Sequence, residues 1–153
     1  MQISKDLREF IDLLNANKVE YIVVGGFAVA WHGHPRFTAD IDFLVRPDRT
    51  NAETLVKALR DFGFGGLGIV PEDLCRPDQI LQLGVKPNRI DLITSIAGVS
   101  FEEAWASRVA GSIDSIPVFF IGLDELIRNK ERAARPQDLA DAHALRKRRP
   151  AGM

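Results

Sequence analysis

The chain has 153 residues, of which 46% are hydrophobic and 27% are charged, and its formal net charge is -1. This length is typical of one domain, and the composition is that of a globular protein rather than a disordered one. Near-neutrality argues against a protein that coats nucleic acid through many phosphate contacts. No apolar run approaches the roughly 20 residues that cross a bilayer, and Cys75 is the only cysteine, so we expect a cytoplasmic protein without a disulfide.

The first third of the chain predicts two helices and two strands. Ser4 can cap a helix in which apolar residues recur at helical spacing and which ends near residues 15–18. The run "YIVVGG" predicts a buried strand that leads into glycines, and "FAVAWHG" predicts a short helix that stops at Gly33. After Pro35 the chain is expected to be extended, and "ADIDFLV" predicts a second strand that ends before Pro47.

The remaining elements predict a mixed sheet. Asp48 or Thr50 can start a helix through "AETLVKALRDFG", and an irregular glycine-rich connection follows. "QILQLGV" and "RIDLITSI" flank the turn-forming "KPN", which suggests a hairpin. A short helix from Ser100 to Arg108, the strand "IPVFFIG" and the helices "LDELIRNKERAA" and "PQDLADAHALRKRR" complete the chain. We therefore predict one domain over residues 1–153 with an α/β (α+β) fold, in which about five strands form a mixed sheet flanked by helices.

Asp40 and Asp42 interrupt an otherwise apolar strand. Alternate side chains of a strand point to opposite faces, so the two carboxylates share one face while Ile41 and Phe43 can enter the core. The carboxylates then lie roughly 7 Å apart, and such a pair calls for a cation, for which Mg²⁺ is suited by its preference for hard oxygen ligands. Two solvated aspartates on an exposed strand face are the alternative. Asp91, set among apolar residues of another predicted strand, favours the metal site if the two strands are neighbours.

Residues that precede Asp40 could face the same ligand. If the chain is extended up to that point, Arg36 and Thr38 share the face of Asp40 and could contact a phosphate chain held on the metal, although Arg36 could equally pair with a carboxylate. Gly25 and Gly26 lie at a strand-to-helix junction, where backbone amides can receive phosphate oxygens. A glycine pair is also common in tight turns, so this signal is weak by itself.

Three motifs taken together resemble the nucleotidyltransferase superfamily of the DNA polymerase β type: the glycine pair, the aspartates of "DID" and the aspartate of "RIDLI". The stretch "GGFAVAWHGHPRFTADIDF" is similar to small bacterial nucleotidyltransferases of toxin-antitoxin and phage-abortive systems and of antibiotic modification. The resemblance covers residues 19–92. It implies a polymerase β-like fold with a catalytic core over about residues 19–95 and a C-terminal helical segment over about residues 122–149.

The resemblance implies a metal-dependent reaction at the three aspartates. Asp40, Asp42 and Asp91 would bind two Mg²⁺ ions, for which Mn²⁺ can substitute, and would catalyse transfer of a nucleoside monophosphate from a nucleoside triphosphate (NTP) to a hydroxyl acceptor, with release of pyrophosphate. The resemblance also implies a set of nucleotide-binding residues: Gly25, Gly26, Arg36, Thr38 and Lys130.

Lys130 belongs to a second region of similarity. With Arg135 and Asp138 of "KERAARPQDLADAHAL", it is similar to residues that line the nucleotide site in the abortive-infection type. An ordinary exposed helix lysine is the alternative.

The acceptor is left open by the sequence. A protein, a tRNA and a small molecule are all compatible with it, and a partner protein encoded by an adjacent gene could help to form the acceptor site. The alternative function is a non-catalytic module of a toxin-antitoxin-like pair that binds a nucleotide or a partner.

Overall fold

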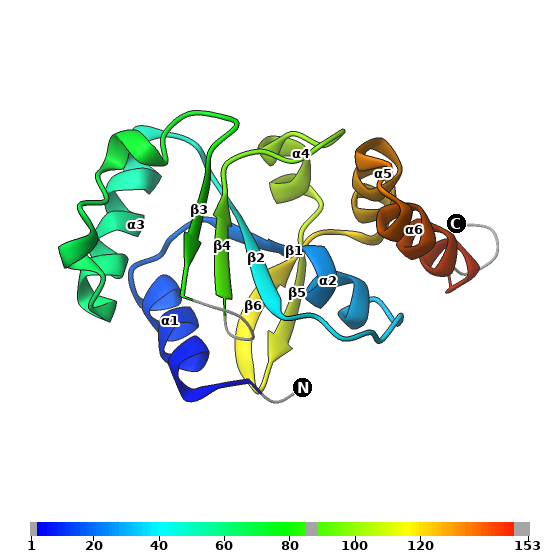
Figure 1. Cartoon of the computed structure of the whole chain (residues 1–153), viewed down its shortest axis with the longest axis horizontal. Coiled ribbons are helices and arrows are strands. Elements are labelled where there is room, and N and C mark those ends of the chain that lie inside the picture. Colours follow the sequence, from blue (N-terminus) through cyan, green and yellow to red (C-terminus); the bar gives the residue numbers. More distant parts are fainter. Residues whose placement is uncertain (1–2, 85–88, 149–153) are drawn as a thin grey trace.

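The computed structural model describes residues 3–84 and 89–148, in which a six-stranded sheet is flanked by helices (Figure 1). The strand order is β3-β4-β2-β1-β6-β5. The β2–β4 and β1–β6 pairs are parallel and the other pairs are antiparallel, so the sheet is mixed, as predicted. The strands are β1 (Tyr21–Val24), β2 (Asp40–Val45), β3 (Ile80–Leu83), β4 (Arg89–Ile93), β5 (Val109–Ile113) and β6 (Ile116–Phe120).

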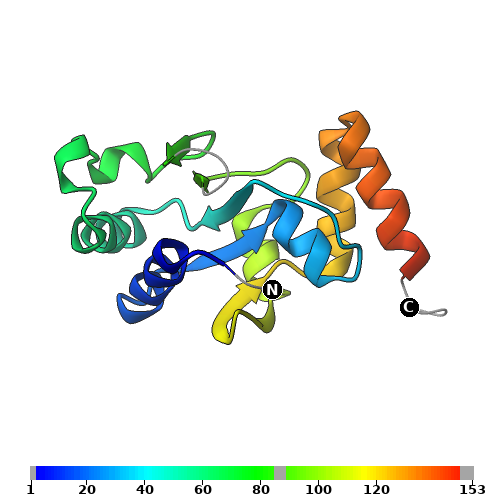
Figure 2. The same ribbon diagram turned by 60° about the horizontal axis from the view of Figure 1, so that its bottom comes forward.

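Two pairs of helices lie on different sides of the molecule. α1 and α3 pack against each other on one side, and α5 and α6 form a helical hairpin on the other (Figures 1 and 2). No described helix combines the length and the apolar character needed to span a membrane. The helices are α1 (Lys5–Ala16), α2 (Gly25–Trp31), α3 (Arg49–Phe62), α4 (Phe101–Ala106), α5 (Leu123–Ala133) and α6 (Pro136–Arg148), and η1 (Gly65–Leu67) and η2 (Pro71–Asp73) are 3₁₀ turns.

Local capping explains why the helices begin where they do. The Ser4 hydroxyl accepts a hydrogen bond from the backbone N–H of Leu7 at 3.1 Å, and Asp48 accepts one from Asn51 at 2.8 Å. Each bond satisfies an amide that the first turn of a helix leaves without a partner, which typically stabilises the helix by about 1 kcal/mol. Both helix starts were predicted from the sequence, and the structure confirms them.

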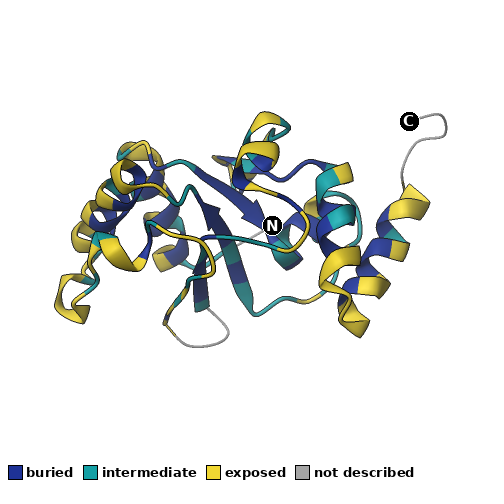
Figure 3. Ribbon diagram, turned by 90° about the horizontal axis from the view of Figure 1, so that it is seen from above, coloured by how far each residue is buried: buried dark blue, intermediate teal, exposed yellow. Residues whose placement is uncertain are grey.

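The side chains of β2 alternate between the core and the opposite face of the strand. Ile41 and Phe43 are fully buried, while Asp40 and Asp42 keep part of their surface exposed. Phe43 contacts the ring of Phe10 on α1 at a centroid distance of 5.8 Å, so the apolar face of β2 is fastened to the helical layer. In Figure 3 the strands are mostly buried and the outer faces of the helices are exposed. The two carboxylates therefore belong to a strand whose other face is packed in the core.

Three details of the fold differ from the predictions. Val109–Ile113 forms a sixth strand, β5, which pairs only with β6 at the edge of the sheet. Its sequence, "VAGSI", carries a weak strand pattern, so the ladder with β6 decides its conformation. The preceding helix ends at Ala106 rather than at Arg108. β2 begins at Asp40, so the segment before it lies outside the ladder. The predicted "KPN" turn lies outside the described residues, so the structure does not test it.

Candidate active site

The sheet places the three aspartates on one side at one cavity. β2 and β4 are parallel neighbours in which Asp42 lies opposite Asp91. Residues opposite each other in a ladder project to the same side, and Asp40 shares that side because it is two residues before Asp42. All three residues line a cavity of about 430 Å³, which also touches the end of β1, strand β3 and helices α5 and α6.

Asp42 is the most strongly perturbed carboxyl group of the cavity. Burial raises its pKa to about 7 from an ordinary value of 3.8, and a hydrogen-bonding contact with Asp91 and the negative charges of Asp91 and Asp40 act in the same direction. Lys130 lowers this pKa, but the carboxylates outweigh it. At Asp42 the neighbouring carboxylates therefore contribute more negative charge than the nearby cation neutralises. A carboxyl group in such surroundings favours binding of a proton or of a cation.

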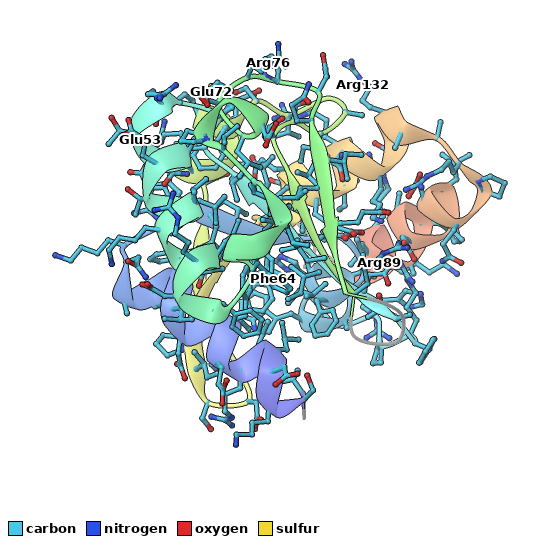
Figure 4. The ribbon with its side chains drawn as sticks, turned by 60° about the vertical axis from the view of Figure 1, so that its left-hand side comes forward. Glu53, Phe64, Glu72, Arg76, Arg89 and Arg132 are labelled. Atoms are coloured by element: carbon cyan, nitrogen blue, oxygen red, sulfur yellow. The ribbon has the colours of Figure 1, made fainter. Side chains whose placement is uncertain are left out.

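Arg89 supplies the positive charge nearest to the other two carboxylates. Its NH2 group lies 2.6 Å from Asp40 Oδ2, and its Nε lies 3.2 Å from Asp91 Oδ1. The side chain is one-quarter exposed, and it belongs to the first residue of β4 (labelled in Figure 4). Arg89 was not among the predicted site residues, although strand alternation places it on the same side as Asp91, two residues later.

The glycine pair brings the start of α2 against the carboxylates. Gly25 has φ +68°, a conformation that glycine adopts without strain, and a Cβ atom at this position would lie 2.1 Å from Asp42 Oδ2. A Cβ atom at Gly26 would lie 2.8 Å from Thr38 Oγ1, and this hydroxyl donates a hydrogen bond to the backbone oxygen of Asp40 at 3.0 Å. Only glycine permits both close approaches. Gly25 lines the cavity, and the role of the pair in phosphate binding stays a prediction.

Arg36 is held by a buried carboxylate of α6. Its Nε and NH2 groups donate to the two oxygens of Asp141, each at 3.0 Å, and the Asp141 side chain is fully buried. Arg36 and Thr38 precede β2 and are not among the residues that line the cavity. Their proposed contacts with phosphate stay predictions, and in this structure Arg36 ties the segment before β2 to the helical hairpin.

Lys130 is buried rather than an exposed helix lysine. Its Nζ lies 3.4 Å from Asp138 Oδ1 and 3.3 Å from Asp141 Oδ2. Asp138 also accepts a hydrogen bond from Arg135 Nε at 2.7 Å. Burial alone would raise the pKa of Asp138, but the hydrogen bond from Arg135 and the charge of Lys130 hold it below its usual range. Lys130, Arg135 and Asp138 all line the cavity, so the hairpin forms its second wall.

Comparison with known proteins identifies the family. The model of the family described as "nucleotidyltransferase of unknown function (DUF6036)" matches residues 1–146. The chain belongs to this nucleotidyltransferase family. No curated protein matches it with significant sequence similarity.

Two solved structures share the nucleotidyltransferase fold of this chain. One is a candidate nucleotidyltransferase from Thermotoga maritima, with 17% sequence identity and a TM-score of 0.56 over 92% of this chain and 88% of that chain. The other is an antigenic nucleotidyltransferase-like protein from Paracoccidioides brasiliensis, with 14% identity and a TM-score of 0.52 over 92% of this chain and 74% of that chain. Sequence identities this low show a common fold, and they do not indicate the substrate of this chain.

The donor chemistry of this nucleotidyltransferase fits a divalent cation, but the side chains are not arranged around one. Asp40 Oδ1 and Asp91 Oδ1 are buried and form no hydrogen bond with any described residue, and carboxylate oxygens are the ligands that Mg²⁺ prefers. Nevertheless, no group of three or more His, Cys, Asp or Glu side chains in residues 3–84 and 89–148 is placed so that it could hold a metal ion. Since Arg89 contacts two of the carboxylates, binding a cation there requires its guanidinium to move.

Sequence reasoning missed two residues that contact the predicted site residues, Arg89 and Asp141. Asp141 follows Asp138 by one helical turn on α6, so the i, i+3 spacing could have placed both on the buried face of that helix. Arg89 precedes Asp91 by two residues on β4, so strand alternation could have placed both side chains on the same face once the strand is recognised. Neither spacing reveals the partner, because Arg36 and Asp141 are 105 residues apart in the chain.

Proposed function

We propose that the protein is a metal-dependent nucleotidyltransferase that moves a nucleoside monophosphate from an NTP to a hydroxyl acceptor and releases pyrophosphate. The observation that carries the proposal is the placement of Asp40, Asp42 and Asp91 at one cavity of a chain that belongs to a nucleotidyltransferase family. This function requires a compartment that supplies NTPs, as the cytoplasm does.

The three aspartates would hold two Mg²⁺ ions, and Mn²⁺ has the same ligand preference. When bound, such ions lower the pKa of an acceptor hydroxyl and neutralise a triphosphate. In the transfer, the acceptor oxygen forms a bond with the α-phosphorus, the bond from that phosphorus to the bridging oxygen of the β-phosphate breaks, and pyrophosphate leaves. Asp91 would accept the hydroxyl proton. One oxygen of its carboxylate, Oδ1, is buried and forms an ion pair with Arg89 but no hydrogen bond with any described residue.

The remaining walls of the cavity would bind and orient the nucleotide. Lys130 and Arg135 line the cavity opposite the carboxylates and carry the positive charge that a triphosphate requires. The backbone at Gly25 approaches Asp42 closely, so a phosphate placed there would lie beside the carboxylates. Positioning and charge neutralisation would supply most of the rate acceleration.

Radiolabelled NTP tests this function directly. The protein is incubated with Mg²⁺, a cell extract and each NTP labelled either on the α-phosphate or on the γ-phosphate. We expect transfer of the α-label only, since transfer of the γ-label would indicate a kinase. The Asp42→Asn variant should lose the transfer, while Asp61→Asn on the exposed surface of α3 should retain it. Labelled RNA, protein or small molecule would then identify the acceptor class.

A non-catalytic binding module is the second candidate. The observation in its favour is that Arg89 already occupies the space between Asp40 and Asp91, so the carboxylates are not arranged for a metal. Calorimetry distinguishes the two functions. Binding of Mg²⁺-NTP without transfer of label to any component of the extract would support the binding module. In that case a protein partner, such as one encoded by an adjacent gene, would be sought by co-purification.

A further inference from the structure

The contacts of Arg89 with the aspartates are set by the backbone. Arg89 lies opposite Asp40 in the parallel β2–β4 ladder, and it lies two residues before Asp91 on the same side of β4. Its side chain therefore projects to the side of both carboxylates in any structure that keeps this register. The contact with Asp40, at 2.6 Å, is a charge-assisted hydrogen bond, whereas the contact with Asp91, at 3.2 Å, is an ion pair without hydrogen-bond geometry.

The other cations of the cavity are bound to carboxylates of α6. Lys130 contacts Asp138 and Asp141, and Arg135 donates to Asp138. Within the described residues, Asp40 and Asp91 form ion pairs with Arg89 alone. Removing Arg89 would thus leave these two carboxylates facing Asp42 with no adjacent guanidinium.

We propose that Arg89 is a built-in counter-ion of the carboxylate site, which a divalent cation displaces, and that this exchange couples metal binding to nucleotide binding. The inference rests on the function proposed above. A guanidinium and a divalent cation compete for the carboxylates of Asp40 and Asp91, so a metal alone binds weakly. When an NTP enters the cavity, its phosphates offer the displaced guanidinium new acceptors, and metal and nucleotide bind together. Arg89 is a positioning residue in this scheme.

A simple phosphate-binding arginine would behave differently. Its loss would weaken nucleotide binding and leave the affinity for metal alone unchanged. Loss of a counter-ion instead strengthens the binding of metal alone, because the cation no longer has to displace a positive charge. It also destabilises the metal-free protein, since the carboxylates then repel one another without compensation. The two roles are therefore separated by whether loss of Arg89 leaves the affinity for metal alone unchanged or raises it.

Electron paramagnetic resonance of free Mn²⁺ measures the required affinity without relying on catalysis. Each protein is titrated with Mn²⁺ in the absence of nucleotide and again with a saturating non-hydrolysable NTP analogue. We expect Arg89→Gln to bind Mn²⁺ alone about tenfold more tightly than the wild type, and the analogue to enhance binding strongly only in the wild type. Arg89→Lys retains the charge and should stay near the wild-type affinity. Arg49→Gln removes the same charge from the exposed surface of α3 and serves as the matched control.

Thermal unfolding provides a second measurement. In EDTA, Arg89→Gln should melt below the wild type by about 3 °C, and saturating Mn²⁺ should raise its Tm by more than it raises that of the wild type. An Asp42→Asn substitution added to Arg89→Gln should abolish the gain, which would assign the bound Mn²⁺ to this site.

The outcomes that overturn the inference differ from those that overturn the proposed function. If Arg89→Gln binds Mn²⁺ alone no more tightly than the wild type while Asp42→Asn still abolishes nucleotidyl transfer, Arg89 is not a counter-ion and the enzyme assignment stands. If neither the wild type nor Arg89→Gln binds Mn²⁺, with or without the NTP analogue, both the inference and the metal-dependent function are wrong.

Discussion

The buried ion pair between Arg36 and Asp141 offers a sharp test of how the helical hairpin is attached. Both oxygens of the fully buried Asp141 accept from Arg36 at 3.0 Å, and Lys130 Nζ lies 3.3 Å away. Asp141→Asn keeps the shape of the side chain but removes the charge that these two cations require. Breaking a buried pair by removing one partner costs about 3–5 kcal/mol. We expect about 3 kcal/mol, because one-quarter of the Arg36 side chain remains exposed and can be hydrated.

The helical hairpin of α5 and α6 contains a matched control. Arg146 of α6 donates to both oxygens of Glu131 of α5 at 2.9 Å and 2.8 Å, with a geometry like that of the buried pair, but both side chains are about half exposed. Water competes for exposed charges, so Glu131→Gln should leave the stability nearly unchanged. The comparison isolates burial, since each pair joins an arginine to both oxygens of a carboxylate on the hairpin at similar distances.

Urea and thermal unfolding followed by circular dichroism measure both effects. For a protein of this size, the loss expected for Asp141→Asn corresponds to a Tm lower by roughly 6–12 °C. A double-mutant cycle with Arg36→Gln should show a coupling energy of at least about 1 kcal/mol. Our reasoning is refuted if Asp141→Asn costs no more than Glu131→Gln, or if the two substitutions of the cycle are additive.

Three further predictions concern the carboxylate site. Because burial and the neighbouring aspartates raise the pKa of Asp42 to about 7, folding favours its protonated form. That stability is fully present below about pH 4 and is lost as the pH rises through about 7, by up to ~4 kcal/mol in metal-free protein. Unfolding in EDTA from pH 4 to 8 should show this loss, and Asp42→Asn should remove it. Mg²⁺ should raise the Tm more at pH 8 than at pH 6, since protons compete for Asp42 at the lower pH; equal shifts would contradict the raised pKa. Gly25→Ala should abolish transfer and destabilise the protein more than Gly68→Ala. Gly68 has a similar φ of +71° but open space where a Cβ atom would lie. Equal losses of stability in urea unfolding would show that the contact with Asp42 is unimportant.

Much of the local structure could be predicted because it depends on neighbours in the sequence. Helical spacing after Ser4 and the cap at Asp48 determine where α1 and α3 begin. The alternation in "ADIDFLV" determines that Asp40 and Asp42 lie opposite the core-facing side of β2. The edge strand β5 was missed because its five residues carry little pattern, and pairing with β6 supplies what the sequence lacks.

The sequence by itself determined the nucleotidyltransferase motifs, the elements that carry them and the side of β2 on which the two aspartates lie. Only the tertiary structure decided which side chains meet there. The β2–β4 ladder sets Asp91 opposite Asp42 and Arg89 opposite Asp40, and the hairpin brings Asp141 to Arg36. Periodicity specifies the direction in which a side chain points, whereas its partner depends on strand order and on the packing of segments that lie far apart in the chain. The charge balance of the site is for this reason a property of the fold.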